Sequence, residues 1–254
     1  MSPWEIAAIL AAGMAAGTIN TVVGSGTLIT FPTLLAFGVP PVTANVSNNI
    51  GLVPGSVAGA WGYRRELNGQ RPRVLWLLSA SVIGAFAGGV LLLTLPEGAF
   101  EAIVPALILL GVALVVFQPR LAAWVALRAE RTGAEHAHGA PWVWPAVLLA
   151  GVYGGYFGAA QGVLLMAILG IGVAESLQRA NAVKNVLAAC VNAVAGLLFA
   201  LAADVDWAIV GLIGLGAVAG GLVGASVGRR LPPLVLRVVI VVVGLAALTA
   251  FLVR

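Results

Sequence analysis

Residues 44–49 read Ala-Asn-Val-Ser-Asn-Asn, and residues 180–185 read Ala-Asn-Ala-Val-Lys-Asn. Both stretches start with Ala-Asn and end with Asn, and the second begins 136 positions after the first. Each lies in a long apolar run, the first at 41–62 and the second at 176–203. A shared polar pattern inside two apolar segments predicts a chain that is built from two related halves.

Glycine positions extend this match in the same order along the chain. Gly26 precedes a short apolar segment, and Gly162 precedes another at the same offset of 136. Residues 84–89 read Gly-Ala-Phe-Ala-Gly-Gly and return at 216–221 as Gly-Ala-Val-Ala-Gly-Gly, at an offset of 132. One match between such common residues would be weak evidence, but three in order within corresponding segments indicate a duplication.

The composition excludes most classes of soluble protein. Of the 254 residues, 61% are hydrophobic and 9% are charged, whereas soluble domains carry about a quarter charged residues. A soluble enzyme and a disordered chain are therefore excluded, and the single cysteine, Cys190, excludes a disulfide scaffold. A polytopic protein of the lipid bilayer remains, and it should be all-helical because open strands cannot cross lipid with unpaired backbone groups.

Ten apolar segments follow one another, and one long polar stretch divides them into two sets of five. Eight approach the roughly 20 residues that a membrane-spanning helix needs, whereas two are too short and either cross fully or form re-entrant hairpins. The segments are 4–22, 27–38, 41–62, 73–95, 98–118, 142–160, 162–172, 176–203, 206–228 and 233–253.

These observations predict an all-α membrane protein with two inverted repeats. Each repeat has five helical segments, of which one is short or re-entrant. The predicted units are an N-terminal membrane repeat at 1–118, a cytoplasmic linker at 119–141 and a C-terminal membrane repeat at 142–254.

The arginines predict the orientation of the chain. The net charge is +4, but the basic residues are thinly spread between apolar runs, which is typical of orientation signals and not of a nucleic-acid partner. The loop near 63–73 holds four arginines and the linker three, so both should lie inside the cell. Asp204 and Asp206 mark an outside turn, after which Arg229 and Arg230 mark an inside one. The halves are thus predicted to be inverted, with both termini outside.

Each short segment follows a break that contains glycine. Residues 24–27 read Gly-Ser-Gly-Thr, and residues 159–162 read Ala-Ala-Gln-Gly. Glycine admits backbone conformations that other residues resist, and a helix that begins at such a break presents unpaired N–H groups to an anion. The alternative is a plain turn between two packed helices.

Most asparagines lie inside apolar segments and not in loops. At 100° per residue, Asn45, Asn48, Asn49 and Ser56 share one face of their helix. The equivalent face of the second helix carries polar residues at related positions, namely Asn181, Lys184, Asn185 and Asn192. Interhelical hydrogen bonding is one explanation for such polar faces. Their recurrence on two repeat-related helices favours a binding site.

Lys184 is the only lysine of the chain and lies deep in its apolar segment. At 1.5 Å per residue it is about 12 Å from residue 176, close to the middle of a hydrocarbon core about 30 Å thick. A buried cation with no carboxylate on its own helix closer than Glu175 suggests that the substrate supplies the negative charge. Pairing of the lysine with carbonyl groups or with Glu175 is the alternative.

The acidic residues lie at segment edges or in polar loops, and none lies in the middle of a segment. A carboxylate proton relay and an acidic cation site are therefore not expected. Ser25 has no histidine or acidic residue at a similar depth to activate it, which argues against an intramembrane serine protease.

A run of glycines and prolines extends from the first break into the third segment. It contains Gly-Ser-Gly-Thr at 24–27, Pro-Thr-Leu-Leu at 32–35, Gly-Val-Pro at 38–40 and Ala44-Asn45, and it has a weaker echo through Gly162, Gly170, Ala180 and Asn181. With the polar linker, this run resembles the TauE/SafE family of bacterial membrane permeases over nearly the whole chain. The second break departs from the pattern, because it is loosened to Ala-Ala-Gln-Gly. Several members export sulfite or related anions such as sulfoacetate, so the resemblance implies an anion exporter of the bacterial plasma (inner) membrane.

The residues and the resemblance together predict a secondary transporter, not an enzyme. It should export a small sulfur oxyanion, sulfite or a related sulfonate, by alternating access. A permease for another organic anion and an anion channel are the alternatives. No cofactor or metal is expected, and the glycine seams leave room for a homodimer. The predicted substrate-binding residues are Ser25, Gly26, Thr27, Asn45, Asn48, Asn49, Gln161, Gly162, Asn181, Lys184 and Asn185.

Overall fold

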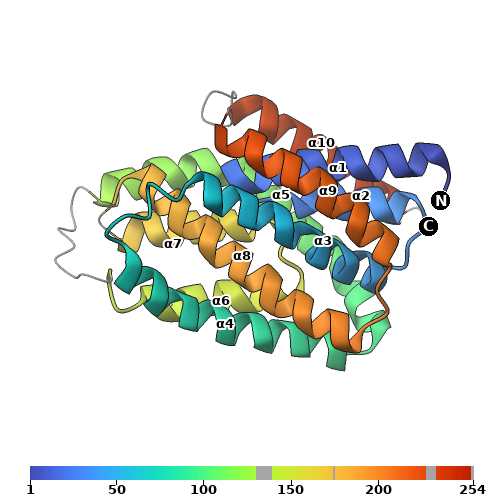
Figure 1. Cartoon of the computed structure of the whole chain (residues 1–254), viewed down its shortest axis with the longest axis horizontal. Helices are drawn as coiled ribbons and strands as arrows, with labels where there is room; N and C mark the ends of the chain where they lie inside the picture. The colour runs from blue at the N-terminus through green and yellow to red at the C-terminus, as the bar shows by residue number, and fades with distance from the viewer. Residues whose placement is uncertain (130–138, 174, 227–232, 253–254) are drawn as a thin grey trace.

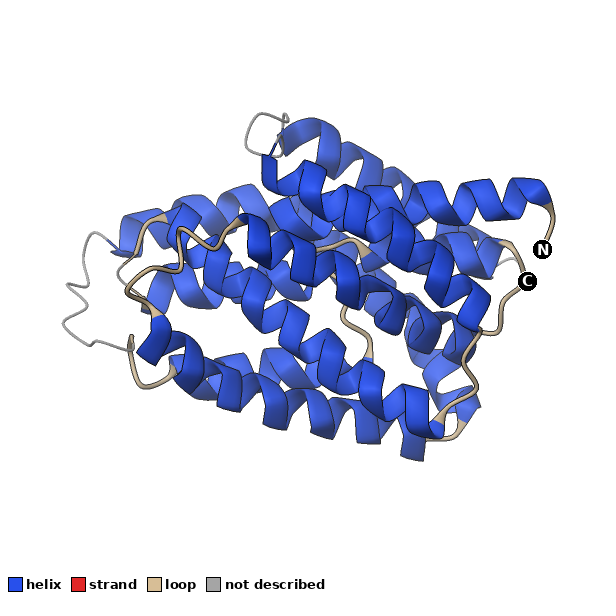
Figure 2. Cartoon of the chain, viewed as in Figure 1, coloured by secondary structure: helices blue, strands red, loops and turns tan. Residues whose placement is uncertain are grey.

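The computed structural model describes residues 1–129, 139–173, 175–226 and 233–252, and these form helices joined by loops, without a strand (Figure 2). The all-helical prediction is therefore confirmed. The helices are α1 (Pro3–Val22), α2 (Thr27–Ala36), α3 (Pro41–Gly62), α4 (Arg71–Thr94), α5 (Glu97–Ala129), α6 (Val143–Tyr156), α7 (Gln161–Gly172), α8 (Leu177–Ala202), α9 (Trp207–Ser226) and α10 (Pro233–Leu252).

Each predicted apolar segment corresponds to one of these helices, and the largest difference is at the end of α5. This helix continues past Pro119 to Ala129, so the segment that was predicted as a linker begins as helix. The remainder of that prediction, at 130–138, lies outside the described residues.

Among the described residues, five helices are long and apolar enough to cross a membrane, at 3–22, 71–94, 98–120, 177–202 and 207–226. Large apolar side chains are exposed on the outside of the bundle, among them Leu149, Leu201 and Leu215. A surface that apolar belongs against lipid tails. The chain is a multi-pass membrane protein.

The two short helices, α2 and α7, each turn back toward the end from which the preceding helix came. For α7 a hydrogen bond shows this directly, because the N–H of Ala140, just before α6, donates to the carbonyl of Gly172 at the end of α7 (2.8 Å). In Figure 1, α2 likewise runs back beside α1 toward the end where the chain begins. The short segments are therefore re-entrant, which the sequence left open.

Helix pairs recur when the two halves are exchanged. The α1–α9 contact has its counterpart in α6–α4, and the α3–α9 contact has its counterpart in α8–α4. The α2–α10 and α7–α5 contacts form a third such pair, whereas α3–α8 and α5–α10 join equivalent helices of the two halves. This pattern supports the interpretation of the chain as a duplication.

Glycine seams allow the closest of these helix pairs to form. A Cβ atom on Gly88 of α4 would lie 2.1 Å from the carbonyl oxygen of Val152 in α6. On Gly220 of α9 it would lie 1.9 Å from the carbonyl oxygen of Met14 in α1. Any larger residue would push these backbones apart, so the repeated glycines serve helix packing, as is common in membranes.

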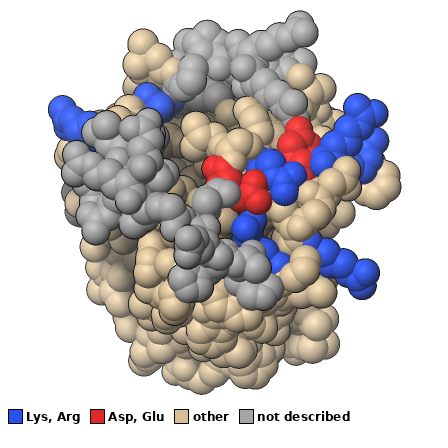
Figure 3. All heavy atoms as spheres, turned by 90° about the vertical axis from the view of Figure 1, so that its left-hand side faces the viewer, with Lys and Arg blue, Asp and Glu red and all other residues tan. Residues whose placement is uncertain are grey.

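The two ends of the bundle differ in charge. The loop between α3 and α4, which carries Arg64 and Arg65, lies at the end opposite to the one where α1 begins and α10 ends (Figure 1). Figure 3 looks onto this end and shows basic side chains gathered around acidic ones. We call it the arginine-rich end; it holds the start of α4 and the connection between α7 and α8.

Candidate functional site

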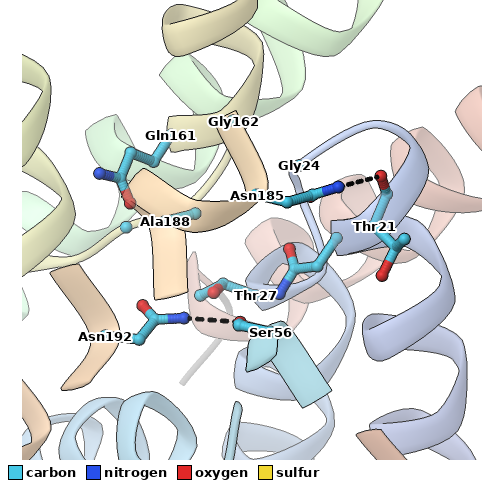
Figure 4. Close-up of a pocket in the computed structure, with 11 residues that line it drawn as sticks. Thr21, Gly24, Thr27, Ser56, Gln161, Gly162, Asn185, Ala188 and Asn192 are labelled. Atoms are coloured by element: carbon cyan, nitrogen blue, oxygen red, sulfur yellow. Dashed lines mark hydrogen bonds between the residues drawn. The ribbon is translucent and has the colours of Figure 1, made fainter. Parts of the chain in front are cut away.

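A small polar cavity lies where the two helix breaks meet α3 and α8 (Figure 4). Its volume is about 20 Å³, which is room for about one water molecule. It is lined by Asn20, Thr21, Gly24, Thr27, Ser56, Gly158, Gln161, Gly162, Asn185, Ala188 and Asn192.

The two breaks cross backbone to backbone at glycine. The N–H of Gly162 donates to the carbonyl oxygen of Gly24 at 3.0 Å. A Cβ on Gly24 would lie 2.3 Å from the Cα of Gly162, and one on Gly162 would lie 2.4 Å from the Cα of Gly24. Gly24 also has φ +90°, a conformation that L side chains rarely adopt. Glycine at both positions therefore allows the breaks of the two halves to touch.

Three side chains of α8 converge on the end of α1. The ammonium group of Lys184 donates to the carbonyl oxygens of Asn20 (2.9 Å) and Thr21 (3.3 Å). The amides of Asn181 (3.2 Å) and Asn185 (3.3 Å) donate to the same Thr21 oxygen. The last carbonyls of a helix lack partners within the helix and carry its negative partial charge, so they suit a cation. Lys184 is fully buried in this arrangement.

The end of α6 is bound in the same way from the other half. The side-chain amide of Asn45 in α3 donates to the carbonyl oxygen of Tyr156, the last residue of α6, at 2.9 Å. Asn45 is the repeat equivalent of Asn181, so each half uses this asparagine to hold the broken helix of the other half. Both side chains are almost completely buried.

The start of α2 is held by two asparagines. The Oδ1 atom of Asn20, at the end of α1, accepts a hydrogen bond of 2.6 Å from the N–H of Gly26. The amide of Asn48 donates to the hydroxyl of Thr27 at 3.4 Å, and its oxygen accepts from the hydroxyl of Thr30. Gly26 is the N-cap residue of α2. The first turn of this re-entrant helix is therefore held by hydrogen bonds to side-chain amides and not to a charged side chain.

Several buried polar atoms around the breaks have no hydrogen-bond partner among the described residues. They include Oγ of Ser25, Nε2 of Gln161 and the Oδ1 atoms of Asn45, Asn49 and Asn181. Leaving such an atom unpaired costs about 1–3 kcal/mol. Their concentration near one cavity is typical of a site that is satisfied by water or by a ligand.

The structure brings the predicted site residues together but separates them into two groups. Thr27, Gln161, Gly162 and Asn185 line the cavity. Six others form or hold the helix breaks, namely Ser25, Gly26, Asn45, Asn48, Asn181 and Lys184. Asn49 is buried on α3 on the side of Gly196 in α8. In particular, Lys184 does not line the cavity. It donates to backbone carbonyls at the end of α1, so the structure shows the alternative in which this lysine pairs with carbonyl groups.

Four polar residues that line the cavity were not among the predicted site residues: Asn20, Thr21, Ser56 and Asn192. A signal existed for three of them. Asn20 is an amide in an apolar segment four positions before the first glycine of its break, and Ser56 and Asn192 share the polar faces of their helices. Thr21 carries no such signal. It accepts hydrogen bonds through its backbone carbonyl, which has no partner within the helix because α1 ends there.

A second polar cluster joins the arginine-rich end. Glu175, in the loop before α8, pairs with Arg73 of α4 (2.8 Å) and Arg179 of α8 (2.5 Å). Arg179 also donates to the carbonyl of Asn68, and Gln70 donates to the carbonyl of Arg179. Partial burial of Glu175 opposes its ionisation, but hydrogen bonds from the two arginines outweigh this and hold its pKa below the usual value. The cluster ties the α3–α4 loop to the start of α8.

Comparison with known proteins gives a consistent result. The family model described as "Sulfite exporter TauE/SafE" matches residues 9–251. The "Probable membrane transporter protein YfcA" of Escherichia coli (strain K12) is 28% identical over 232 residues, which cover 91% of this chain and 82% of that protein. The "Probable membrane transporter protein ORF9" of Sinorhizobium sp is 26% identical over 248 residues, which cover 95% and 90%. No solved structure gives a significant match.

Proposed function

The chain belongs to the TauE/SafE family of membrane transporters, and from this premise we propose that it exports a small sulfur oxyanion from the bacterial cytoplasm by alternating access. Sulfite or a related sulfonate is the proposed cargo. The observation that carries the proposal is the polar cavity between the two crossing helix breaks, which is lined by amides and hydroxyls from both halves of the chain.

The chemistry of the cavity favours an anion over a cation. Its lining residues include no aspartate or glutamate, and they provide amide groups from Gln161, Asn185 and Asn192 and hydroxyls from Thr27 and Ser56. Such donors replace the hydration of an oxyanion. The re-entrant helices α2 and α7 begin beside the cavity, so their positive ends face it and stabilise negative charge there.

Lys184 compensates the charge of the ligand from behind the end of α1. Its ammonium group is fully buried and bound to the carbonyls of Asn20 and Thr21, which both line the cavity. In an interior of low dielectric constant, a charge acts over a longer distance than in water. We therefore assign Lys184 an electrostatic role without direct contact with the cargo.

The size of the cavity and the cluster at the arginine-rich end both support alternating access as the proposed mechanism. A cavity of about 20 Å³ does not hold sulfite without rearrangement of its lining. The Arg73–Glu175–Arg179 cluster closes the end that we assign to the cytoplasm, with both chain termini outside. Export then requires this cluster to part while the cargo enters and to re-form before it leaves.

The membrane potential supplies a driving force for such export. With the cell interior negative, anion exit is favoured by about 2.3 kcal/mol per charge per 100 mV. This driving force is sufficient for the proposed export without a coupled ion.

Reconstitution in proteoliposomes tests the proposal. Vesicles loaded with sulfite at mildly alkaline pH, where little permeant sulfur dioxide forms, should lose it faster than protein-free vesicles, with saturation and counterflow. Parallel vesicles loaded with sulfoacetate or with acetate distinguish the cargo. Faster loss of acetate alone would point to another organic anion, flux without saturation or counterflow would point to a channel, and no flux of any anion would contradict the proposal.

A further inference from the structure

We propose that the side chain of Asn20 is a built-in substitute for the transported anion, which the anion must displace in order to bind. Its amide oxygen occupies the place at the start of α2 where an oxygen of the cargo would sit. This inference rests on the proposed function and adds to it a specific residue that controls access to the site.

The first support is the position of the Asn20 oxygen. Oδ1 accepts the N–H of Gly26 at 2.6 Å, at the N-cap position of the re-entrant helix α2. No side chain of the N-cap residue fills this place, because that residue is glycine. A Cβ on Gly26 would lie 2.9 Å from Cγ of Asn20, so only glycine lets the amide approach so closely. An acceptor oxygen at a helix N-terminus is what an oxyanion provides.

The second support is a pair of buried polar atoms, one in each helix break, that lack partners among the described residues. Gln161, the first residue of α7, lines the same cavity with 4% of its surface exposed, and its Nε2 has no acceptor among the described residues. The hydroxyl of Ser25, next to Gly26, is 1% exposed and equally unpartnered. Unpaired amide and hydroxyl donors are the groups that further oxygens of a ligand would satisfy. The amide oxygen of Asn20 accepts from the N–H of Gly26 and leaves these other two groups without a partner.

The third support is the link between Asn20 and Lys184. The backbone carbonyl of Asn20 accepts from the Lys184 ammonium at 2.9 Å, while its side-chain oxygen accepts from Gly26. Asn20 therefore joins the buried cation to the positive end of α2. An anion that replaces the neutral amide oxygen gains the attraction of both, whereas a neutral ligand does not. The site then selects an oxyanion with at least two acceptor oxygens, one for Gly26 and one for the unpaired donors.

Rotation of the Asn20 side chain would also supply room that the cavity lacks. Asn20 is partly exposed to the cavity, in contrast to Gly26 and Ser25, which are buried. If this partly exposed side chain rotates away, it frees the N–H of Gly26. The same rotation of Asn20 would thus expose the binding group and widen the cavity.

Two substitutions of Asn20 distinguish displacement from a structural role. Asn20→Asp fixes a carboxylate of similar shape at the start of α2 near Lys184, and it should weaken sulfite binding by about a hundredfold or more, because like charges repel. Asn20→Ala removes the competing oxygen, and sulfite should bind at least as tightly as to the wild-type protein. Sulfite affinity is measured by isothermal titration in detergent. Thr94→Asp, which adds the same charge at an exposed position at the end of α4, is the control and should bind as the wild type does.

The outcomes separate the two proposals. Equal weakening by Asp and Ala would assign Asn20 a structural role and overturn the inference, as would wild-type affinity in the Asp variant. If the wild-type protein binds no sulfite and no sulfonate, the proposed function itself fails. Because Asn20→Ala could disturb the end of α1, thermal unfolding of both variants without ligand is measured first. If the Ala variant is unfolded, the affinity of the Asp variant alone tests the inference. The unfolding temperature of the Asp variant should be at or above that of the wild type.

Discussion

The side-chain amide of Asn192 donates a hydrogen bond of 3.2 Å to the hydroxyl of Ser56, and the two residues are 136 positions apart. This is the offset that separates the two asparagine patterns, so each residue contacts its own repeat equivalent. When two halves of a chain are related by a two-fold axis, equivalent residues can touch only close to that axis. Both residues line the cavity, which therefore lies where the relationship between the halves would place a shared site.

The contacts around the cavity follow this symmetry except at the charged residue Lys184. Asn45 and Asn181 bind the broken helix of the opposite half in the same way. Lys184 binds the end of α1, whereas its repeat equivalent Asn48 binds Thr27 and Thr30 of α2. The two breaks are thus held alike by an asparagine, but among the described residues a cation binds only at the first. This asymmetry gives the cavity a positive side, on the half where Asn20 lies.

Replacement of Lys184 by methionine tests the electrostatic role. The variant keeps the length of the side chain and loses its charge, so we expect sulfite flux to fall by about tenfold or more, since an anion in the cavity loses its compensating charge. The carbonyls of Asn20 and Thr21 also lose a charged donor, which should cost about 1–3 kcal/mol of stability. Flux is measured in proteoliposomes that contain equal amounts of folded protein, checked by size-exclusion chromatography. Flux that equals the wild-type value would remove Lys184 from the mechanism.

Contact between the two breaks should be required for transport. In Gly162→Ala a methyl group would lie 2.4 Å from the Cα of Gly24 and would force the breaks apart. We expect flux to be lost and the unfolding temperature to fall. The added methyl group meets backbone atoms of Gly24, which cannot move aside as the end of a flexible side chain would. Gly211→Ala in α9 is the control, since nothing lies within 4 Å of its added Cβ, and it should transport normally. Normal flux in both variants would argue against a role for the crossing.

Ala160 is held in a left-handed conformation in the second break. Its φ is +59°, and no other described non-glycine residue has a positive φ. Its equivalent in the first half is Gly24, also left-handed. Ala160→Gly should relieve about 1–2 kcal/mol of strain while it loses a buried methyl group. Ala159→Gly loses an equally buried methyl group without that relief, so it should be the less stable variant by about 1 kcal/mol. Thermal unfolding in detergent measures the difference, and a more stable Ala159 variant would contradict it.

The sequence predicts most of this fold because the helices depend on local patterns. Apolar runs give the helices, the asparagine and glycine matches indicate the duplication, and the two short segments mark the breaks. The length of α5 was not predictable in the same way, since Arg120, Arg128 and Pro119 read as a polar linker although helix continues through them.

The partners of the site residues were not predictable from the sequence. Lys184 was expected to sit deep in the bundle without an acidic partner on its helix, but its contact with the Asn20 carbonyl joins residues more than half the chain apart. Such a contact depends on where α1 ends, and a carbonyl leaves no mark in the sequence. The same reason explains why Thr21, whose oxygen accepts from three donors, was missed.

Opening of the arginine-rich end should depend on the charge of Glu175. Glu175→Gln removes both ion pairs, to Arg73 and Arg179, while it preserves the shape of the side chain. Arg179 then holds the carbonyl of Asn68 less firmly, so backbone amides of residues 64–70 should exchange with deuterium faster, as mass spectrometry can measure. Glu101→Gln, at an exposed position of α5, is the control and should exchange as the wild type does.

The pH dependence of this exchange follows from the direction of the pKa shift. The arginines hold the pKa of Glu175 below its ordinary value of about 4.3. Its ionised form therefore supports the cluster at neutral pH, and this support is lost only as the pH falls through the lowered pKa. After correction for the intrinsic exchange rate, wild-type exchange at 64–70 should stay constant from about pH 8 to pH 5, while Glu175→Gln stays fast throughout. A wild-type protein that loosens near neutral pH, or a variant that exchanges like the wild type, would show that another contact closes this end.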